Sequence, residues 1–272
     1  MVDVGAAEAG LKDVAVRVAS EAAELARRAR DAMVAGEPVQ VETKSTATDV
    51  VTAVDRAVEQ LVRDRLAELR PGDHVLGEEA GGSSGDGVTW VVDPIDGTVN
   101  FLYGVPLFAV SLAAQVGGVS VAGAVVEPVS GRCWTAVRGS GAWLDGRRLS
   151  VSSPSRLDLS LVGTGFAYSA QRRARQAQFV AGLLTRVRDV RRAGVASLDL
   201  CAVAAGWLDG YVEHGLNRWD WAVGALVAEE AGAVVSLPGE DGALGTDATF
   251  AAAPSIAEAL HAAAVECGAK DV

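Results

Sequence analysis

The spacing of hydrophobic residues predicts two long helices at the start of the chain. Between Ala6 and Met33, apolar residues recur every three or four positions, as in Leu11, Val14 and Val18, which is typical of an amphipathic helix. The segment AGEPVQ ends this helix, because glycine and proline do not continue it. A second helix is expected from about Val54 to Leu69, before Arg70-Pro71-Gly72.

The middle of the chain is predicted to be rich in strands. A short strand at His74–Leu76 and an apolar strand ending before Asp93 flank the segment GEEAGGSSGDG, which is expected to be an exposed loop. From Leu107 to about Val151, apolar runs are separated by Gly-Gly, Glu-Pro, Ser-Gly and Asp-Gly. This pattern indicates consecutive antiparallel strands joined by tight turns.

The second half alternates strands with helices. Strands are expected at Leu159–Gly163, Asp189–Arg192, Gly210–Glu213, Ala233–Leu237 and Thr249–Ala252, and helices at Ala170–Val187, Ser197–Trp207, Trp219–Ala231 and from Pro254 onward. Such alternation favours an α/β fold with sheets covered by helices, in layers. A chain of 272 residues could form one large domain or two intimate ones.

Composition narrows the classes of function. The formal net charge of -11 argues against binding nucleic acid or an anionic membrane through bulk charge, and leaves cationic ligands open. Cys133, Cys201 and Cys267 fit neither a disulfide framework nor a zinc site, so a reducing cytoplasm is the simplest setting. No targeting segment or run long enough to span a bilayer is recognised, and a soluble protein is expected.

Acidic residues occur next to turn signals at four places that border apolar segments. These are TDVVTAVD with Asp49 and Asp55, LGEEA with Glu78 and Glu79, DPID with Asp93 and Asp96, and RWDWA with Asp220. Taken singly, each has an ordinary explanation: Asp55 could cap a helix, Glu78 and Glu79 could lie in a solvated loop, and Asp220 could pair with Arg218.

Together these carboxylates favour a site for hard cations. Buried carboxylates stay ionised only when a positive partner compensates them, and no Lys or Arg lies between Trp90 and Phe101. Ligation by oxygen alone suits Mg²⁺, Ca²⁺ or Mn²⁺. Zinc is disfavoured because His74, His214 and His261 show no ligand spacing.

The residues after Asp96 favour an anion beside those cations. In GTVNF, Gly97 allows a close approach of the backbone to a ligand, and Thr98 offers a hydroxyl. A helix that begins there would present backbone N–H groups, which bind phosphate.

The motifs GEE, DPIDGTVNF and WDWAVGALVAEEAG, in this order along the chain, resemble those of the inositol monophosphatase family of Mg²⁺-dependent, lithium-sensitive phosphatases. The resemblance extends from the first helix to about Ala253 and is strongest to the inositol-1-monophosphatases of actinobacteria. It implies a single domain over residues 1–272 with a layered αβαβα sandwich. Its sheet-rich half would cover about 1–151 and its alternating half about 152–272. A homodimer is also implied.

The resemblance also implies roles for the acidic residues. Glu78, Asp93 and the carbonyl of Ile95 would hold one Mg²⁺. Asp93, Asp96 and Asp220 would hold a second, and Glu78 would help with a weaker third.

Further residues would complete the site by the same resemblance. Thr98, in contact with Asp55, would orient the attacking water, and the amides of Gly97 and Thr98 would receive the phosphate. The substrate pocket would be formed with Gly194, Ala196 and Glu213, and Lys44 and Glu79 would lie near the site. Val195 departs from the Ser or Thr usual in the family, which puts one pocket contact in doubt.

Hydrolysis of a phosphate monoester is the expected activity, with inositol 1-phosphate as the leading substrate. A phosphate dianion repels hydroxide, so catalysis needs positive charge on the phosphoryl oxygens and a generated nucleophile, which two metal ions supply. Histidinol phosphate, 3′-phosphoadenosine 5′-phosphate and fructose 1,6-bisphosphate are rival substrates, because each would use the same metal site.

Two other classes of function stay open. The arginines between Arg172 and Arg192 could form a basic face that binds RNA or an acidic protein, or they could be a solvated surface paired with acidic residues. A glycosidase with paired carboxylates fits poorly, because neither carboxylate has an obvious apolar pocket to raise its pKa.

Overall fold

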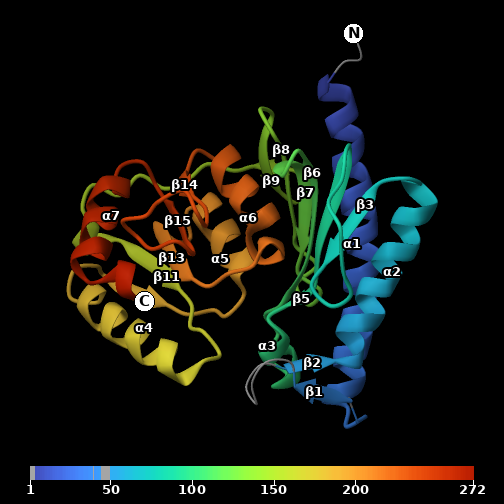
Figure 1. Ribbon diagram of the computed structural model, residues 1–272, viewed down its shortest axis with the longest axis horizontal. Coiled ribbons are helices and arrows are strands. Elements are labelled where there is room, and N and C mark those ends of the chain that lie inside the picture. The colour runs from blue at the N-terminus through green and yellow to red at the C-terminus, as the bar shows by residue number, and fades with distance from the viewer. Residues whose placement is uncertain (1–3, 39, 44–49) are drawn as a thin grey trace.

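Helices and sheets alternate in five layers. The computed structural model describes residues 4–38, 40–43 and 50–272. Helices α1 and α2 cover one face of an eight-stranded sheet, and α5 and α6 lie between that sheet and a five-stranded one (Figure 1). Helices α4 and α7 cover the outer face of the second sheet. The predicted α/β sandwich with the layer order αβαβα is confirmed.

The elements follow one another along the chain in the order that the sequence pattern predicts. The helices are α1 (Val4–Val34), α2 (Ala53–Leu69), α3 (Thr98–Leu102), α4 (Ala170–Leu183), α5 (Ala196–Ala204), α6 (Arg218–Glu230) and α7 (Ala257–Glu266), with 3₁₀ turns at Leu157–Leu159 and Ala269–Asp271. The first-half strands are β1 (Val41–Thr43), β2 (Val50–Thr52), β3 (His74–Gly77), β4 (Gly81–Gly82), β5 (Val88–Asp96), β6 (Ala109–Val116), β7 (Val119–Val126), β8 (Cys133–Val137), β9 (Gly141–Leu144) and β10 (Arg147–Arg148). The second-half strands are β11 (Leu161–Thr164), β12 (Asp189–Arg191), β13 (Gly210–His214), β14 (Val234–Ser236) and β15 (Ala248–Ala252).

The eight-stranded sheet is mostly antiparallel. Its order is β10-β9-β8-β7-β6-β5-β3-β4, and only the β3–β5 pair is parallel. From β5 to β10 each strand pairs with the next one in sequence, as the spacing of Gly-Gly and Asp-Gly turns predicts. The five-stranded sheet, ordered β12-β11-β13-β15-β14, is mixed, with parallel pairs at β11.

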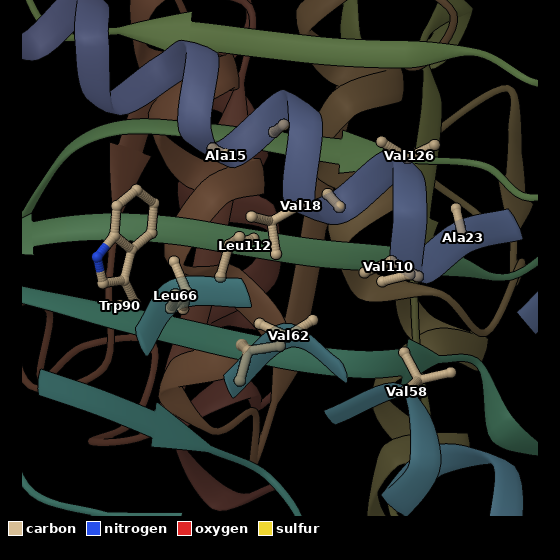
Figure 2. Close-up of a cluster of buried hydrophobic side chains, with 14 of the residues drawn as sticks. Ala15, Val18, Ala23, Val58, Val62, Leu66, Trp90, Val110, Leu112 and Val126 are labelled. Atoms are coloured by element: carbon tan, nitrogen blue, oxygen red, sulfur yellow. The ribbon is translucent and has the colours of Figure 1, made fainter. Parts of the chain in front are cut away.

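One apolar core lies between the first sheet and helices α1 and α2. Figure 2 shows Ala15 and Val18 of α1 and Val62 and Leu66 of α2 facing Leu112 and its neighbours on the sheet. Small residues on α1, which include Ala15, Ala19, Ala22 and Ala26, are fully buried. Because alanine adds little width, α1 packs close to β6 and β7.

Helices α5 and α6 join the two sheets. One face of the pair, with Cys201, Val223 and Leu226, packs on the first sheet beside Trp134. The other face, with Leu200, Val203 and Ala225, packs on the second sheet beside Tyr211. A helix that is apolar on both faces is buried, and α5 is buried along nearly its whole length while α6 is buried from Ala222 to Ala228. The two sheets therefore share one buried helical layer, and the single domain over residues 1–272 stays a prediction.

Several predicted boundaries need correction. Helix α4 ends at Leu183 instead of Val187, because Thr185 turns back to donate its hydroxyl to the Gly182 carbonyl oxygen. Helix α5 ends at Ala204 instead of Trp207, where Gly206 adopts a φ of 70°. The strand predicted from Leu159 begins at Leu161, because residues 157–159 form a 3₁₀ turn.

Three short strands were missed. The β1–β2 hairpin precedes α2, and β4 interrupts the loop predicted at GEEAGGSSGDG. Each has only two or three residues, too few to show an alternation of apolar and polar positions.

Among the described residues, no helix combines the length and the apolar composition that crossing a bilayer requires.

Truncation of Leu66 should destabilise the whole fold. Leu66 is 1% exposed on the face of α2 that packs on the sheet, so Leu66→Ala should lower the free energy of unfolding by about 2–5 kcal/mol. Gln60 lies exposed on the same helix, and Gln60→Ala should change it by less than about 0.5 kcal/mol. Urea unfolding followed by circular dichroism measures both, and equal effects would contradict this assignment of the core.

Candidate active site

The end of β5 carries Asp93 and Asp96 into the interior. Strand β5 pairs with β6 up to Asp93 and again at Asp96, with a register shift between the two positions. Pro94 lies in this bulge and has no N–H to offer the ladder. Asp93 is 1% exposed and Asp96 is 7% exposed. The strand therefore runs past Asp93, further than predicted, and delivers two buried carboxylates to one place.

The predicted turn at Gly97 leads into the short helix α3. Gly97 adopts a φ of 95°, and a Cβ at this position would lie 2.9 Å from the side chain of Val195. Thr98 Oγ1 lies 3.0 Å from Asp55 Oδ1 and 3.0 Å from the Ile95 carbonyl oxygen. Since the hydroxyl has one proton, it can donate to only one of these acceptors at a time, and the other can receive a proton from elsewhere.

Asp55 both caps α2 and contacts Thr98. Its Oδ2 accepts a hydrogen bond of 2.9 Å from the Thr52 amide, which forms a capping box, and its Oδ1 faces Thr98. Burial raises the pKa of the Asp55 carboxyl, although the hydrogen bonds from Thr52 and Thr98 oppose this. Asp55 therefore caps α2, which the sequence had suggested, and at the same time contacts Thr98, which the resemblance had implied.

Glu59 supports the turn that carries Glu78 and Glu79, and sequence analysis missed it. The Glu59 carboxylate, 1% exposed, accepts hydrogen bonds from the amides of Glu79 (2.7 Å) and Ala80 (3.1 Å) and pairs with Arg63. It fills the space above Gly77, where a Cβ would lie 2.2 Å from Glu59 Oε1. In sequence, Glu59 and Arg63 show only the spacing of an ordinary surface ion pair.

Asp220 approaches the same place from the second half of the chain. It is the third residue of α6 and its Oδ2 accepts a hydrogen bond of 2.6 Å from the Asn217 amide, in a capping box. Arg218 donates to Ser84 instead of pairing with Asp220. The ion pair considered from sequence is therefore wrong.

Asp96 also caps α5, and so links the two halves. Its Oδ2 accepts a hydrogen bond of 2.7 Å from the Ser197 amide in the first turn of that helix. Val195, at the N-cap position, has no side-chain cap and is fully buried. The hydroxyl that Val195 lacks is thus not needed to cap α5, because Asp96 supplies an acceptor.

Glu213 projects from β13 beside Tyr211. The Tyr211 hydroxyl donates to Glu213 Oε2, and a Cβ on Gly165 would lie 2.0 Å from Glu213 Oε1. Burial raises the pKa of Glu213 to about 7. Gly165 and Tyr211 thus fix the position of this carboxylate, and no motif in the sequence singled them out.

A cavity of about 320 Å³ brings most of the predicted site residues together. Its lining includes Glu78, Asp93, Ile95, Asp96, Gly97, Thr98, Gly194, Ala196, Glu213 and Asp220. Asp55 is buried behind Thr98, Glu79 is not part of the lining, and Lys44 lies outside the described residues. Arg172 and Arg192 also line the cavity, although they were treated in sequence only as members of a possible surface cluster.

The carboxylates in this cavity disfavour one another's ionisation. Burial raises the pKa of Asp93 well above its usual value, and the nearby charges of Glu78, Asp96 and Asp220 raise it further. Burial raises the pKa of Asp96 to about 6 in spite of the hydrogen bond from Ser197. Burial and the charge of Asp96 likewise raise the pKa of Asp220. A cation among these groups would reverse the effect.

The donor set suits a hard cation. Asp93, Asp96 and Asp220 each use one oxygen to accept a backbone N–H, which leaves the other oxygen for a ligand. In the part of the chain that the structure describes, no three His, Cys, Asp or Glu side chains stand ready around a single ion. Mg²⁺ takes oxygen ligands and keeps several of its waters, so it does not need a ligand set that is closed before it binds. The residues present therefore fit Mg²⁺.

Comparisons with known proteins show the family of this chain. The model of the inositol monophosphatase family matches residues 9–269. The chain is 54% identical over 270 residues to the inositol-1-monophosphatase of Mycobacterium leprae, which covers 93% of this chain and 92% of that protein.

Several relatives carry the name SuhB. The solved structure of Mycobacterium tuberculosis SuhB is 45% identical and matches with a TM-score of 0.81 over 96% of this chain and 98% of that one. The Nus factor SuhB of Escherichia coli K12 is 39% identical over 228 residues, which is 82% of this chain and 84% of that protein. The family model spans nearly the whole chain, and the chain therefore belongs to the inositol monophosphatase family of phosphatases.

Proposed function

We propose that this phosphatase hydrolyses inositol 1-phosphate to inositol and phosphate, with Mg²⁺ as its cofactor. The observation that carries the proposal is the group of four acidic residues, Glu78, Asp93, Asp96 and Asp220, that lines one cavity beside Gly97 and Thr98. The name of the Mycobacterium leprae relative supports inositol 1-phosphate as the leading substrate.

The acidic residues would hold two or three Mg²⁺ ions. Glu78, Asp93 and the Ile95 carbonyl are proposed for the first ion, and Asp93, Asp96 and Asp220 for the second. Glu78 is also proposed for a weaker third ion. Bound Mg²⁺ lowers the pKa of a coordinated water and neutralises charge on phosphate oxygens.

Thr98 and Asp55 are proposed to orient the attacking water. Asp55 is buried and accepts from Thr52, so it has a fixed position, and its second oxygen lies 3.0 Å from Thr98 Oγ1. While Thr98 donates to Asp55 or to the Ile95 carbonyl, its oxygen lone pairs can accept a proton from water. The proton that the water loses can then pass along Thr98 toward Asp55, whose raised pKa favours the protonated form.

The rest of the cavity is proposed to bind substrate. The backbone amides of Gly97 and Thr98 lie beside Asp96 and would contact the phosphate. Gly194 and Ala196 would line the space for the polyol, and the fixed Glu213 carboxylate would accept hydrogen bonds from its hydroxyls. A carboxylate that accepts hydrogen bonds from ring hydroxyls is the feature that favours a neutral polyol such as inositol.

The cellular setting is proposed from the cysteines and the relatives. Cys133, Cys201 and Cys267 are free, which suits a reducing cytoplasm. A homodimer is proposed by family resemblance, and Tyr103, which is 83% exposed near the cavity-lining Thr98, is a candidate contact residue.

A regulatory role is the second candidate function. It is favoured by the relatives named Nus factor SuhB. The arginine cluster offers it little support, because Arg172, Arg186 and Arg191 pair with Asp247, Glu266 and Asp189. Arg173 donates to the carbonyls of residues 167 and 168. Three of the seven arginines between Arg172 and Arg192 thus pair with acidic residues, and a fourth donates to backbone carbonyls.

Phosphate release should depend on Mg²⁺. With Mg²⁺, a panel of inositol 1-phosphate, histidinol phosphate, 3′-phosphoadenosine 5′-phosphate and fructose 1,6-bisphosphate should show the highest kcat/KM for inositol 1-phosphate. Excess EDTA should abolish turnover, and millimolar Li⁺ should inhibit it. Full activity in EDTA would remove the metal proposal, and turnover of none of the four substrates would leave the regulatory role as the better one.

Thr98→Ala should lower kcat by about 100-fold and change KM little, because the orientation of water matters in the transition state. Thr98→Ser keeps the hydroxyl and should recover most of the activity. Steady-state kinetics on inositol 1-phosphate measure both variants. A loss confined to KM would reassign Thr98 to the binding of substrate.

The metal-free protein should lose stability as the pH rises. The folded-state pKa of Asp96, about 6, lies above its unfolded value, as does that of Asp93. The stability that these neutral carboxyls contribute is complete below the unfolded pKa and is lost as the pH rises through the folded one. In protein freed of metal by dialysis, Tm should therefore fall between about pH 5 and about pH 8.

Two controls identify the cause of this fall. Saturating Mg²⁺ should remove it, because ligand binding stabilises the ionised native state. Asp93→Asn should make the fall of Tm with pH smaller, because one of the repelling charges is gone. Without metal at about pH 8, this variant should melt at or above the wild-type Tm. A variant that melts well below wild type there would make Asp93 a structural hydrogen-bonding residue.

A further inference from the structure

Asn100 joins separate segments of the chain beside the cavity. It lies in the short helix α3, and its side-chain amide donates one hydrogen bond of 2.9 Å to the Leu107 carbonyl oxygen and another of 3.0 Å to the Ala193 carbonyl oxygen. An asparagine amide has two N–H donors, so both are used. Asn100 belongs to the GTVNF motif but is not part of the cavity lining. Its side chain therefore acts on the site only through the backbone that it holds.

One wall of the cavity is formed by the segment that connects β12 to α5. We call residues 193–196 the wall segment, and its Gly194 and Ala196 line the cavity. Val195 is fully buried among apolar side chains, which fixes the second half of the segment. Gly194 has no side chain to pack and adopts a φ of 78°. The first half of the wall segment thus depends on hydrogen bonds, and Asn100 supplies one of them.

The wall segment lies directly against the turn that leads into α3. Gly97 adopts a φ of 95°, and a Cβ there would lie 2.9 Å from Val195 Cγ2 and 3.4 Å from the Gly194 carbonyl oxygen. One residue beyond the wall segment, the Ser197 amide donates to Asp96 at 2.7 Å. The two stretches of backbone are therefore in contact on both sides of Val195, and the hydrogen bond from α3 extends this contact to the start of the wall segment.

This contact joins the two sides of the proposed substrate site. Under the proposed function, the amides of Gly97 and Thr98 contact the phosphate, and Gly194 and Ala196 line the space for the polyol. The distance between these two groups decides which alcohol fits between them, and a displacement of about 1 Å can lower a reaction rate strongly. Asn100 lies in the same helix as Thr98 and holds the wall segment, so it links the phosphate side to the polyol side.

We propose that Asn100 is a positioning residue for the selection of substrate, because it holds the wall segment at the distance from Gly97 that suits a ring-shaped polyol. This inference rests on the proposed function, which assigns the phosphate to Gly97 and the polyol to the wall segment. Loss of Asn100 should affect a substrate that reaches the wall segment and spare one that occupies mainly the phosphate side.

Two substrates of different size test this role. Inositol 1-phosphate carries a six-membered ring, whereas glycerol 2-phosphate carries a three-carbon alcohol that reaches less of the wall segment. Asn100→Ala should raise KM for inositol 1-phosphate by about 10-fold and leave kcat within about 3-fold, as expected when binding is lost equally in the ground state and the transition state. For glycerol 2-phosphate, both constants should change by less than about 2-fold.

Leu102→Ala is the matched control. Leu102 also lies in α3 but packs against the apolar core of α1 and α2, so its truncation loosens the helix without removing a hydrogen bond of Asn100. Any kinetic loss that it causes should be equal for the two substrates, because Thr98 serves both. Equal losses in Asn100→Ala would mean that Asn100 only stabilises α3, and would overturn the proposal. Unchanged kinetics on both substrates would overturn it as well.

Hydrogen exchange separates failure of this role from failure of the proposed function. If neither ester is hydrolysed, the proposed function fails, and exchange of the backbone amides of residues 192–198 decides the role of Asn100. Mass spectrometry should show this exchange at least about 10-fold faster in Asn100→Ala than in wild type, and unchanged in Leu102→Ala. Equal rates in Asn100→Ala and wild type would exclude the role. Asn100→Asp, whose carboxylate has no donor, replaces Asn100→Ala if the alanine variant does not fold.

Discussion

The mutual repulsion of buried carboxylates is the constraint on which the rest of the structure depends. Asp93 and Asp96 are nearly inaccessible, and Glu78 and Asp220 add to the charge around them. A fold tolerates a cluster of buried carboxylates only if other interactions hold the side chains in place and if a ligand can balance their negative charge. The backbone N–H groups of Ile95, Ser197 and Asn217 hold the aspartates in place, because each fixes one carboxylate oxygen. Metal ions are the proposed ligand.

The layered architecture provides those fixed positions. Because α5 and α6 pack on both sheets, the first turns of these two helices are held beside the end of β5. Asp96 reaches across to cap α5, and Asp220 lies in the first turn of α6. The four carboxylates repel one another, so apolar packing in the central layer must keep them close together.

Sequence analysis predicted most of the fold and most of the cavity lining, but not the contacts that support them. Long periodic segments such as α1 and strict motifs such as DPIDGTVNF can be recognised from the sequence alone. Glu59, Tyr211 and Gly165 carry none, because a buried support is defined by what lies against it in three dimensions. Arg192 shows the same limit. The cluster of seven arginines indicated a charged surface, and only the tertiary structure separates Arg172 and Arg192, which line the cavity, from Arg191, which pairs outside it.

The wide separation of the site residues along the chain has a consequence for biosynthesis. Asp55, Glu78 and the DPID segment leave the ribosome well before Glu213 and Asp220, which follow more than a hundred residues later. The eight-stranded sheet can begin to form on the nascent chain while its acidic edge is still open to water and weakly strained. Closure of that edge by α5 and α6 comes later, after residues 196–230 have been synthesised. The most costly electrostatic step of folding is thus deferred until nearly all of the apolar surface that can offset it has been synthesised.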